Sequence, residues 1–116
     1  MERKTPVIGI DFYIANNEKE AAVSIKTVKF EENIQDYLLE SKLGDSFELL
    51  TGLDQYGDKL FSVQEINQLI KICEALQTTC RQPQEIDLKA RTFAESLKGL
   101  CLEALELNKL VFAAGD

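Results

Sequence analysis

Residues 83–112, PQEIDLKARTFAESLKGLCLEALELNKLVF, decide the fold class of this chain. Pro83 suits the first turn of a helix, where its missing N–H costs nothing, and we expect this helix to run from Gln84 to about Phe112. Apolar residues recur along it at alternating spacings of four and three, which is typical of a helix that packs against another helix: Ile86, Ala90, Phe93, Leu97, Leu100, Ala104, Leu107 and Val111.

Further apolar side chains of this helix lie off that seam: Leu88, Cys101, Leu102, Leu105 and Phe112. A long helix in a small domain normally supplies the core, so we favour burial for this surplus apolar surface. The alternative is contact with a partner, including a second copy of the chain, which would make the protein a homo-oligomer or a structural adaptor.

A second helix is predicted just upstream. Ser62 and Glu65 have the spacing of a capping box, in which each side chain accepts a hydrogen bond from a backbone N–H at the start of the helix. An apolar stripe follows and fades by Thr78 to Cys80: Val63, Ile66, Leu69, Ile70, Cys73 and Leu76.

The N-terminal part has the period of strands. Alternating apolar residues predict a strand over 5–14, a polar turn over 16–20 and a second strand over 22–30. The apolar residues of the second strand change face part-way, which a bulge near Lys26 or Thr27 would repair. Helices over 31–43 and from Ser46 to Gly52 follow. The sequence therefore predicts one α+β domain over residues 1–116, an N-terminal antiparallel β-hairpin packed on three to four helices.

Charge and composition exclude several classes of function. The chain has 116 residues, a net charge of −7 and no histidine. Acidity argues against direct binding to nucleic acid and suits a basic protein partner, although it also serves solubility. Without histidine or a glycine-rich phosphate loop we expect no enzyme, no catalytic residue and no cofactor. With no secretory signal and no apolar run near about 18 residues, we expect a cytoplasmic protein that does not bind membranes.

The three cysteines do not predict a disulfide or a metal site. Cys73 and Cys80 would be separated by about 10 Å of rise on one helix, whereas a disulfide needs Cα atoms within about 7 Å. Neither a Cys-x-x-Cys pair nor histidine is present, so zinc lacks ligands. We expect Cys73 and Cys101 to be buried structural thiols.

Residues 54–65, DQYGDKLFSVQE, have part of the pattern of a twelve-residue calcium loop. Oxygen-bearing side chains stand at four of its ligand positions: Asp54, Asp58, Ser62 and Glu65. However, Tyr56 replaces a ligand and Lys59 stands where the loop needs glycine. We therefore predict no metal site and keep a degenerate calcium-binding module as an alternative function.

The predicted helix over 31–43 carries an acidic face. Glu32, Asp36 and Glu40 are spaced four apart and would line one side of this helix, with Tyr37 beside them. Such charges usually form a solvated surface. The functional alternative is an acidic interface with an aromatic anchor.

Residues 53–62, LDQYGDKLFS, resemble a pattern of small bacterial proteins in which an Asp-x-Tyr-Gly-Asp turn leads through an apolar pair into a helix. In size, acidity and α+β organisation the whole chain resembles immunity proteins of bacterial polymorphic-toxin and contact-dependent growth-inhibition systems. The resemblance implies a cytosolic inhibitor that blocks the toxic domain of a cognate effector, often a nuclease. We predict as partner-binding residues Glu32, Asp36, Tyr37, Glu40, Asp54, Tyr56 and Asp58. The turn also has a structural explanation, in which Gly57 takes a positive φ and Asp58 accepts hydrogen bonds.

Overall fold

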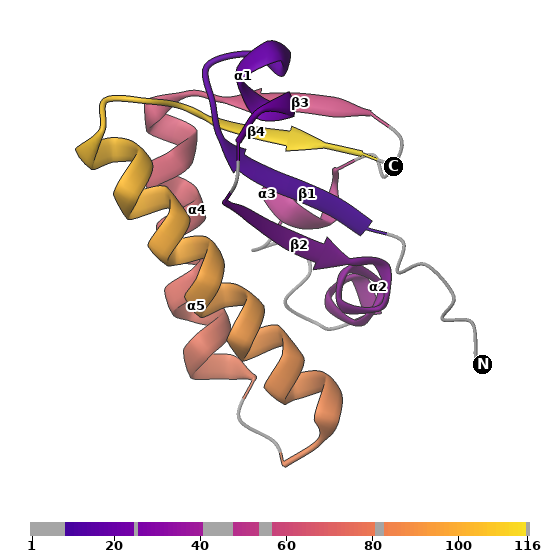
Figure 1. Cartoon of the computed structure of the whole chain (residues 1–116). Coiled ribbons are helices and arrows are strands. Elements are labelled where there is room, and N and C mark those ends of the chain that lie inside the picture. Colours follow the sequence, from indigo (N-terminus) through magenta and orange to yellow (C-terminus); the bar gives the residue numbers. More distant parts are fainter. Residues whose placement is uncertain (1–8, 25, 41–47, 54–56, 81–82, 116) are drawn as a thin grey trace, which may run out of the picture.

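The computed structural model describes residues 9–24, 26–40, 48–53, 57–80 and 83–115. It confirms the α+β class and the long helix near the C-terminus (Figure 1). The elements follow one another as β1 (Gly9–Ile14), α1 (Glu18–Ala22), β2 (Thr27–Glu31), α2 (Glu32–Glu40), α3 (Glu48–Thr51), β3 (Asp58–Phe61), α4 (Val63–Thr79), α5 (Glu85–Glu106) and β4 (Val111–Ala114).

The strands form an antiparallel sheet in the order β2-β1-β4-β3. The predicted hairpin of β1 and β2 is present and forms one half of this sheet, with Phe12 opposite Val28. The other half comes from β3 and β4, which the sequence analysis did not predict. β4 lies between β1 and β3, so the first and last strands of the chain are neighbours (Figure 1).

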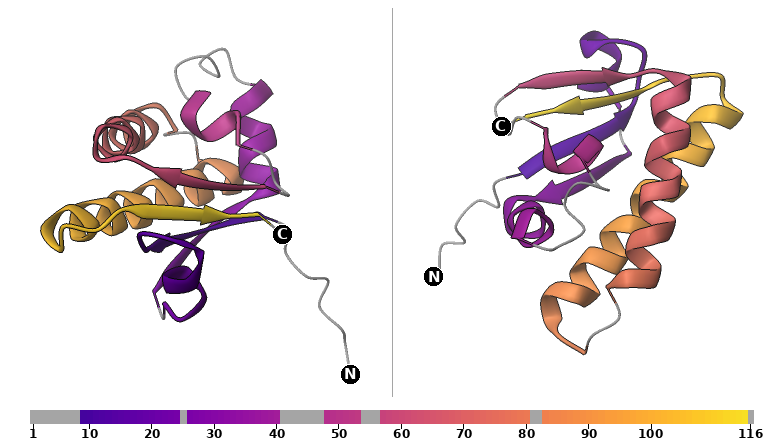
Figure 2. Two further views of the ribbon diagram at one scale, coloured as in Figure 1. Left: turned by 90° about the horizontal axis from the view of Figure 1, so that it is seen from above. Right: turned by 180° about the vertical axis from the view of Figure 1, so that it is seen from behind.

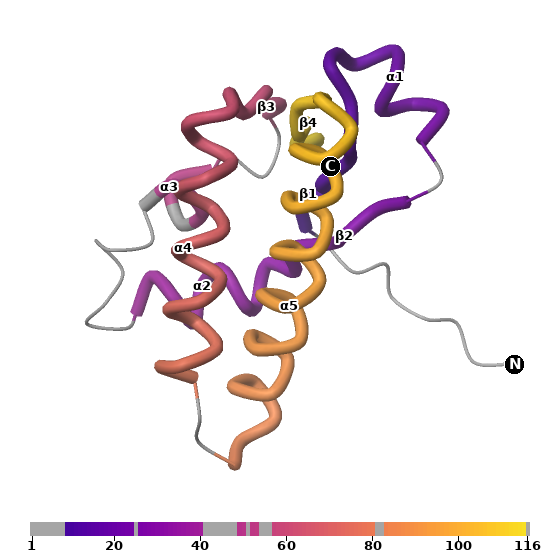
Figure 3. Tube along the Cα trace, turned by 90° about the vertical axis from the view of Figure 1, so that its left-hand side faces the viewer, coloured from indigo at the N-terminus to yellow at the C-terminus, as the bar shows by residue number. Residues whose placement is uncertain are grey.

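The helices cover the two faces of the sheet unequally. α4 and α5 pack side by side as an antiparallel pair on one face, and α1 lies against the other (Figures 2 and 3). Aromatic side chains fill the centre of the main core: the Phe30 and Phe93 rings stack with centroids 4.6 Å apart, and Phe12 stands 5.9 Å from Phe61. Burial of such rings is the main stabilising contribution in a domain of this size.

The last predicted helix ends earlier than expected. α5 covers Glu85–Glu106, so Pro83 stands just before its first turn. Asn108 has a φ of 57°, its N–H donates to the Leu105 carbonyl and the Lys109 N–H donates to the Ala104 carbonyl. This is a Schellman motif, which ends a helix and turns the chain. The predicted continuation of the helix to Phe112 is therefore wrong, and those residues form β4.

The predicted strand over 22–30 is also shorter than expected. Asn17 caps α1 by accepting a hydrogen bond from the Glu20 N–H (2.9 Å), so the residues predicted as a polar turn begin a helix. β2 begins only at Thr27 and pairs with β1 without a bulge. The change of face in the sequence therefore reflects the end of a helix, and Val23 after it is 80% exposed.

The start of α4 is as predicted. The Glu65 N–H donates to the Ser62 hydroxyl (3.2 Å) and the Ser62 N–H donates to the Glu65 carboxylate (3.0 Å), which completes the capping box. The helix ends at Thr79 with Cys80 as its cap. In the described part of the chain no helix has the length and apolar character needed to span a bilayer.

Candidate functional site

The predicted acidic face lies on α2. Asp36 and Glu40 are exposed and Glu32 is half-buried, while Ile34 and Leu38 face the core. The helix begins directly after β2, so the edge strand and the core contacts fix its position (Figure 1). The sequence pattern thus placed the acidic residues correctly on a surface helix.

These three carboxylates are not neutralised within the described residues. The ion pairs that the structure shows there involve other acidic side chains. Like charges four residues apart cost a helix about 0.2–0.5 kcal/mol for each pair. Glu40 also stands at the C-terminal end, where the helix dipole disfavours negative charge and no basic residue lies in the last turn. Glu32 lies in the first turn, where the dipole favours a negative charge, so the local cost to the stability of α2 comes from Asp36 and Glu40.

Tyr37 is half-buried, and its hydroxyl donates a hydrogen bond to the Asp87 carboxylate of α5. Asp87 is fully buried. The hydrogen bond to Asp87, then burial and then the negative charge of Asp87, raise the pKa of Tyr37 to about 12. The polar end of this predicted anchor is thus engaged inside the protein, and it fastens α2 to α5.

Asp58, the one predicted site residue of the 54–58 turn that the structure describes, does not extend the acidic face of α2. Asp54 and Tyr56 lie outside the described residues, whereas Asp58 is exposed at the start of β3. In the register of the sheet Asp58, Ala114, Asp11 and Lys29 form one row across the four strands. Neighbouring strands lie about 4.8 Å apart, so Asp58 is about 14 Å from the edge from which α2 starts.

Gly57, to which the structural explanation of the turn gave a positive φ, lies directly before β3. No glycine among the described residues has a positive φ. The Gly57 carbonyl accepts a hydrogen bond from the Gly115 N–H (2.9 Å), which joins the bend before β3 to the residue after β4.

Glu65, the last residue of the partial calcium pattern, is fully engaged. One carboxylate oxygen accepts from the Ser62 N–H and the other pairs with the Lys59 ammonium at 3.0 Å. These hydrogen bonds with Ser62 and Lys59 lower the pKa of Glu65. Within the described residues no three acidic or cysteine side chains gather as metal ligands. The geometry favours the helix cap for Glu65.

The cysteines are buried free thiols, as expected for Cys73 and Cys101. Burial raises the pKa of Cys73 strongly and that of Cys101 to about 12, and it also raises the pKa of Cys80. A thiol reacts as the thiolate, so none of them is a poised nucleophile.

Two buried polar side chains were missed by the sequence analysis. Asp87 continues toward the N-terminus the buried stripe of α5 that includes Ala90 and Ala94, and this spacing is the signal that could have identified it. Gln35 is 3% exposed, and its amide donates to the carbonyls of Leu50 (3.2 Å) and Leu53 (3.0 Å). The Tyr37–Asp87 hydrogen bond holds α2 against α5, and the Gln35 amide holds it against α3 and the chain just after it. The two contacts thereby also fix the position of the acidic face.

Comparison of this chain with protein-family models, with curated proteins and with solved structures gave no match.

Proposed function

We propose that this chain is a cytoplasmic, non-enzymatic immunity protein, which binds a cognate bacterial toxin domain in a stoichiometric complex and occludes its basic active site. The acidic face of α2 is the observation that carries this proposal. Glu32, Asp36 and Glu40 lack a cationic partner among the described residues. Asp36 and Glu40, beyond the first turn, reduce the stability of α2. Local cost of this kind is typical of a functional surface.

The chemistry of the proposed partner follows from the sign of the charge. A nuclease must bind phosphate groups, so its active site is basic. A net charge of −7 attracts such a site over long range, and carboxylates on a fixed helix can take the places of phosphates. Tyr37 and Gln35 support the geometry, because they hold α2 in place before the partner arrives.

Co-expression tests this proposal. The partner to be co-expressed is the product of the gene immediately upstream, which the proposal expects to be a secreted protein with a variable C-terminal toxin domain. The readouts are growth and the amount of purified complex. We expect protection of growth, a 1:1 complex, and loss of the toxin's activity in proportion to the added chain. A lack of both complex and protection would exclude the proposed function.

A matched pair of variants locates the interface. The test variant removes the acidic face of α2: Glu32→Gln, Asp36→Asn and Glu40→Gln. The control removes three exposed carboxylates elsewhere, which also lack an ion pair among the described residues: Glu18→Gln, Glu95→Gln and Glu106→Gln. Each variant removes three negative charges, so both change the net charge of the protein by the same amount. Because close interfacial charge pairs contribute on the order of 1.5 kcal/mol or more each, loss of three pairs should weaken binding at least about a thousandfold. Equal loss in both variants would show only a general charge effect.

A further inference from the structure

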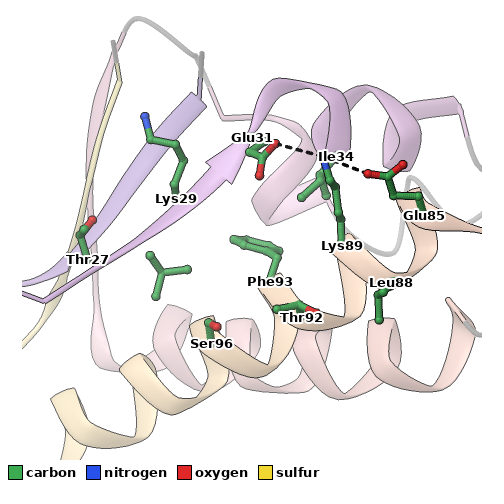
Figure 4. A pocket seen from close by; sticks show the side chains of 11 residues that line it. Thr27, Lys29, Glu31, Ile34, Glu85, Leu88, Lys89, Thr92, Phe93 and Ser96 are labelled. Atoms are coloured by element: carbon green, nitrogen blue, oxygen red, sulfur yellow. Dashed lines mark ion pairs between the residues drawn. The ribbon is translucent and has the colours of Figure 1, made fainter. Parts of the chain in front are cut away.

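A groove runs between the edge strand β2 and the first half of α5, beside the start of α2 (Figure 4). Its volume is about 480 Å³, which lies within the range of about 300–1,000 Å³ typical of small-ligand sites. Buried side chains form an apolar floor, and Leu88, at 56% exposure, forms one wall. The floor consists of Val28, Ile34 and Phe93.

The rim of the groove carries charge that is not fully balanced. Lys89 lies between two carboxylates, with its ammonium 3.9 Å from both Glu31 and Glu85 (Figure 4). The other lysine of the rim, Lys29, pairs with Asp11 at 3.5 Å on the neighbouring strand. The lining itself holds two lysines and two glutamates. With Asp11, which holds Lys29 from the neighbouring strand, the cluster has three carboxylates and two ammonium groups, an excess of one negative charge.

Lys89 is held weakly in this position. A distance of 3.9 Å exceeds that of a charge-assisted hydrogen bond, about 2.7–2.9 Å. The side chains of Lys89 and Glu85 are 41% and 85% exposed, and ion pairs in such surroundings contribute little. A second cation can therefore approach the two carboxylates at a small cost while Lys89 turns into solvent.

We propose that this groove binds an arginine side chain of the basic partner. Its aliphatic stem would lie on Leu88 and Phe93, and its guanidinium would reach Glu31 and Glu85. Arginine fits better than lysine because its planar donors can serve two carboxylates and its plane stacks on aromatic rings. The inference rests on the proposed function only for the identity of the partner. The acidic face of α2 starts at the residue after Glu31, so one partner can contact both this face and the groove.

Titration of the full chain with short peptides tests the groove without the toxin. The probe is acetyl-Leu-Arg-Leu-amide, and the comparison peptide carries citrulline, a neutral isostere, in place of arginine. Amide chemical shifts of Leu88 and Thr92 should change saturably with the arginine peptide, and the citrulline peptide should bind about fivefold more weakly. Tighter binding of a peptide with glutamate in place of arginine would overturn the proposal, since Lys89 would then be the recognising group. Absence of any saturable shift would overturn it as well.

Two variants have matched controls on the same helix. Leu88→Ala should weaken the arginine peptide, whereas Leu102→Ala, also an exposed leucine of α5 but outside the groove, should not. Glu85→Gln should weaken it about fivefold, with Glu95→Gln unchanged. Peptide binding that responds equally to test and control variants would contradict the assignment.

The tests of the groove and the test of the proposed function can fail independently of each other. If the chain protects growth and Glu85→Gln protects equally well, the immunity function stands and the groove is not used. If the peptide binds but no toxin complex forms, the arginine site stands and the proposed function fails.

Discussion

Removal of the Tyr37 hydroxyl should destabilise the protein strongly, although only one oxygen atom is lost. In Tyr37→Phe the fully buried Asp87 carboxylate loses one hydrogen-bond donor. Hydrogen bonds to charged groups contribute about 1.5–3 kcal/mol, which is a large part of the roughly 5–15 kcal/mol that stabilises a typical domain. At about 4 °C for each kcal/mol, the melting temperature should fall by about 6–12 °C.

Denaturant unfolding of Tyr37→Phe measures this loss against a matched control. Tyr13→Phe is that control, because Tyr13 is also half-buried and its hydroxyl makes no hydrogen bond that the structure shows among the described residues. The control should change the free energy of unfolding by less than about 0.5 kcal/mol. An equal effect of the two variants would refute the role given to the bond between Tyr37 and Asp87.

The same pair predicts a dependence on alkaline pH. The pKa of Tyr37 is raised to about 12, from about 10 in the unfolded chain, so the folded state holds this proton more tightly. The stability that this proton contributes is present below pH 10 and is lost as pH rises toward 12. The difference in unfolding free energy between wild type and Tyr37→Phe should therefore shrink across this range. A constant difference would contradict the hydrogen bond.

Substitutions at three positions and one labelling experiment test the backbone and the core. Gly99→Ala in α5 should stabilise the protein by about 0.5–1 kcal/mol, because a Cβ there meets no atom within 4 Å; Gly9→Ala should destabilise it, since a Cβ would lie 2.5 Å from the Phe30 carbonyl oxygen. Both are measured by denaturant unfolding, and a gain for Gly9→Ala would contradict the sheet geometry. Asn108→Ala should cost about 1–2 kcal/mol while Asn108→Gly costs less, because the residue has a φ of 57°; equal melting temperatures would argue against the Schellman motif. Thiol labelling of the native protein with Ellman's reagent should proceed only as fast as unfolding, and fast labelling would contradict the burial of Cys73, Cys80 and Cys101.

Local signals predicted the helices better than the sheet. The capping box at Ser62 fixed the start of α4, because it is formed by residues three apart. β4 was missed because Val111 continues the apolar spacing of α5, and only the helix end at Asn108 separates the two elements. β3 is four residues long and leads directly into a helix cap, so its period is too short to detect. Strands whose partners are distant in sequence leave a weak local pattern.

In the candidate site, too, the features set by local sequence were predicted and those set by tertiary contacts were not. The sequence placed Asp36 and Glu40 correctly on an exposed helix face, since the period of a helix is a local property. It did not predict that Tyr37 would donate to Asp87, fifty positions away. The groove beside β2 was beyond prediction for the same reason, because its walls come from two elements that only the tertiary fold brings together.

The central place of β4 in the sheet has a consequence for how the chain folds. β1 and β2 are separated only by residues 15–26, which include α1, and can pair early, but β3 and β4 are separated by the whole α4–α5 pair. Closure of such a long loop costs conformational entropy before the strand contacts form and stabilise it. Pairing of β4 should therefore come late and limit the folding rate. Until then β1 exposes a free edge, which is open to pairing with other chains. Formation of the α4–α5 pair should therefore bring β3 and β4 together during folding, and variants that loosen this pair should aggregate.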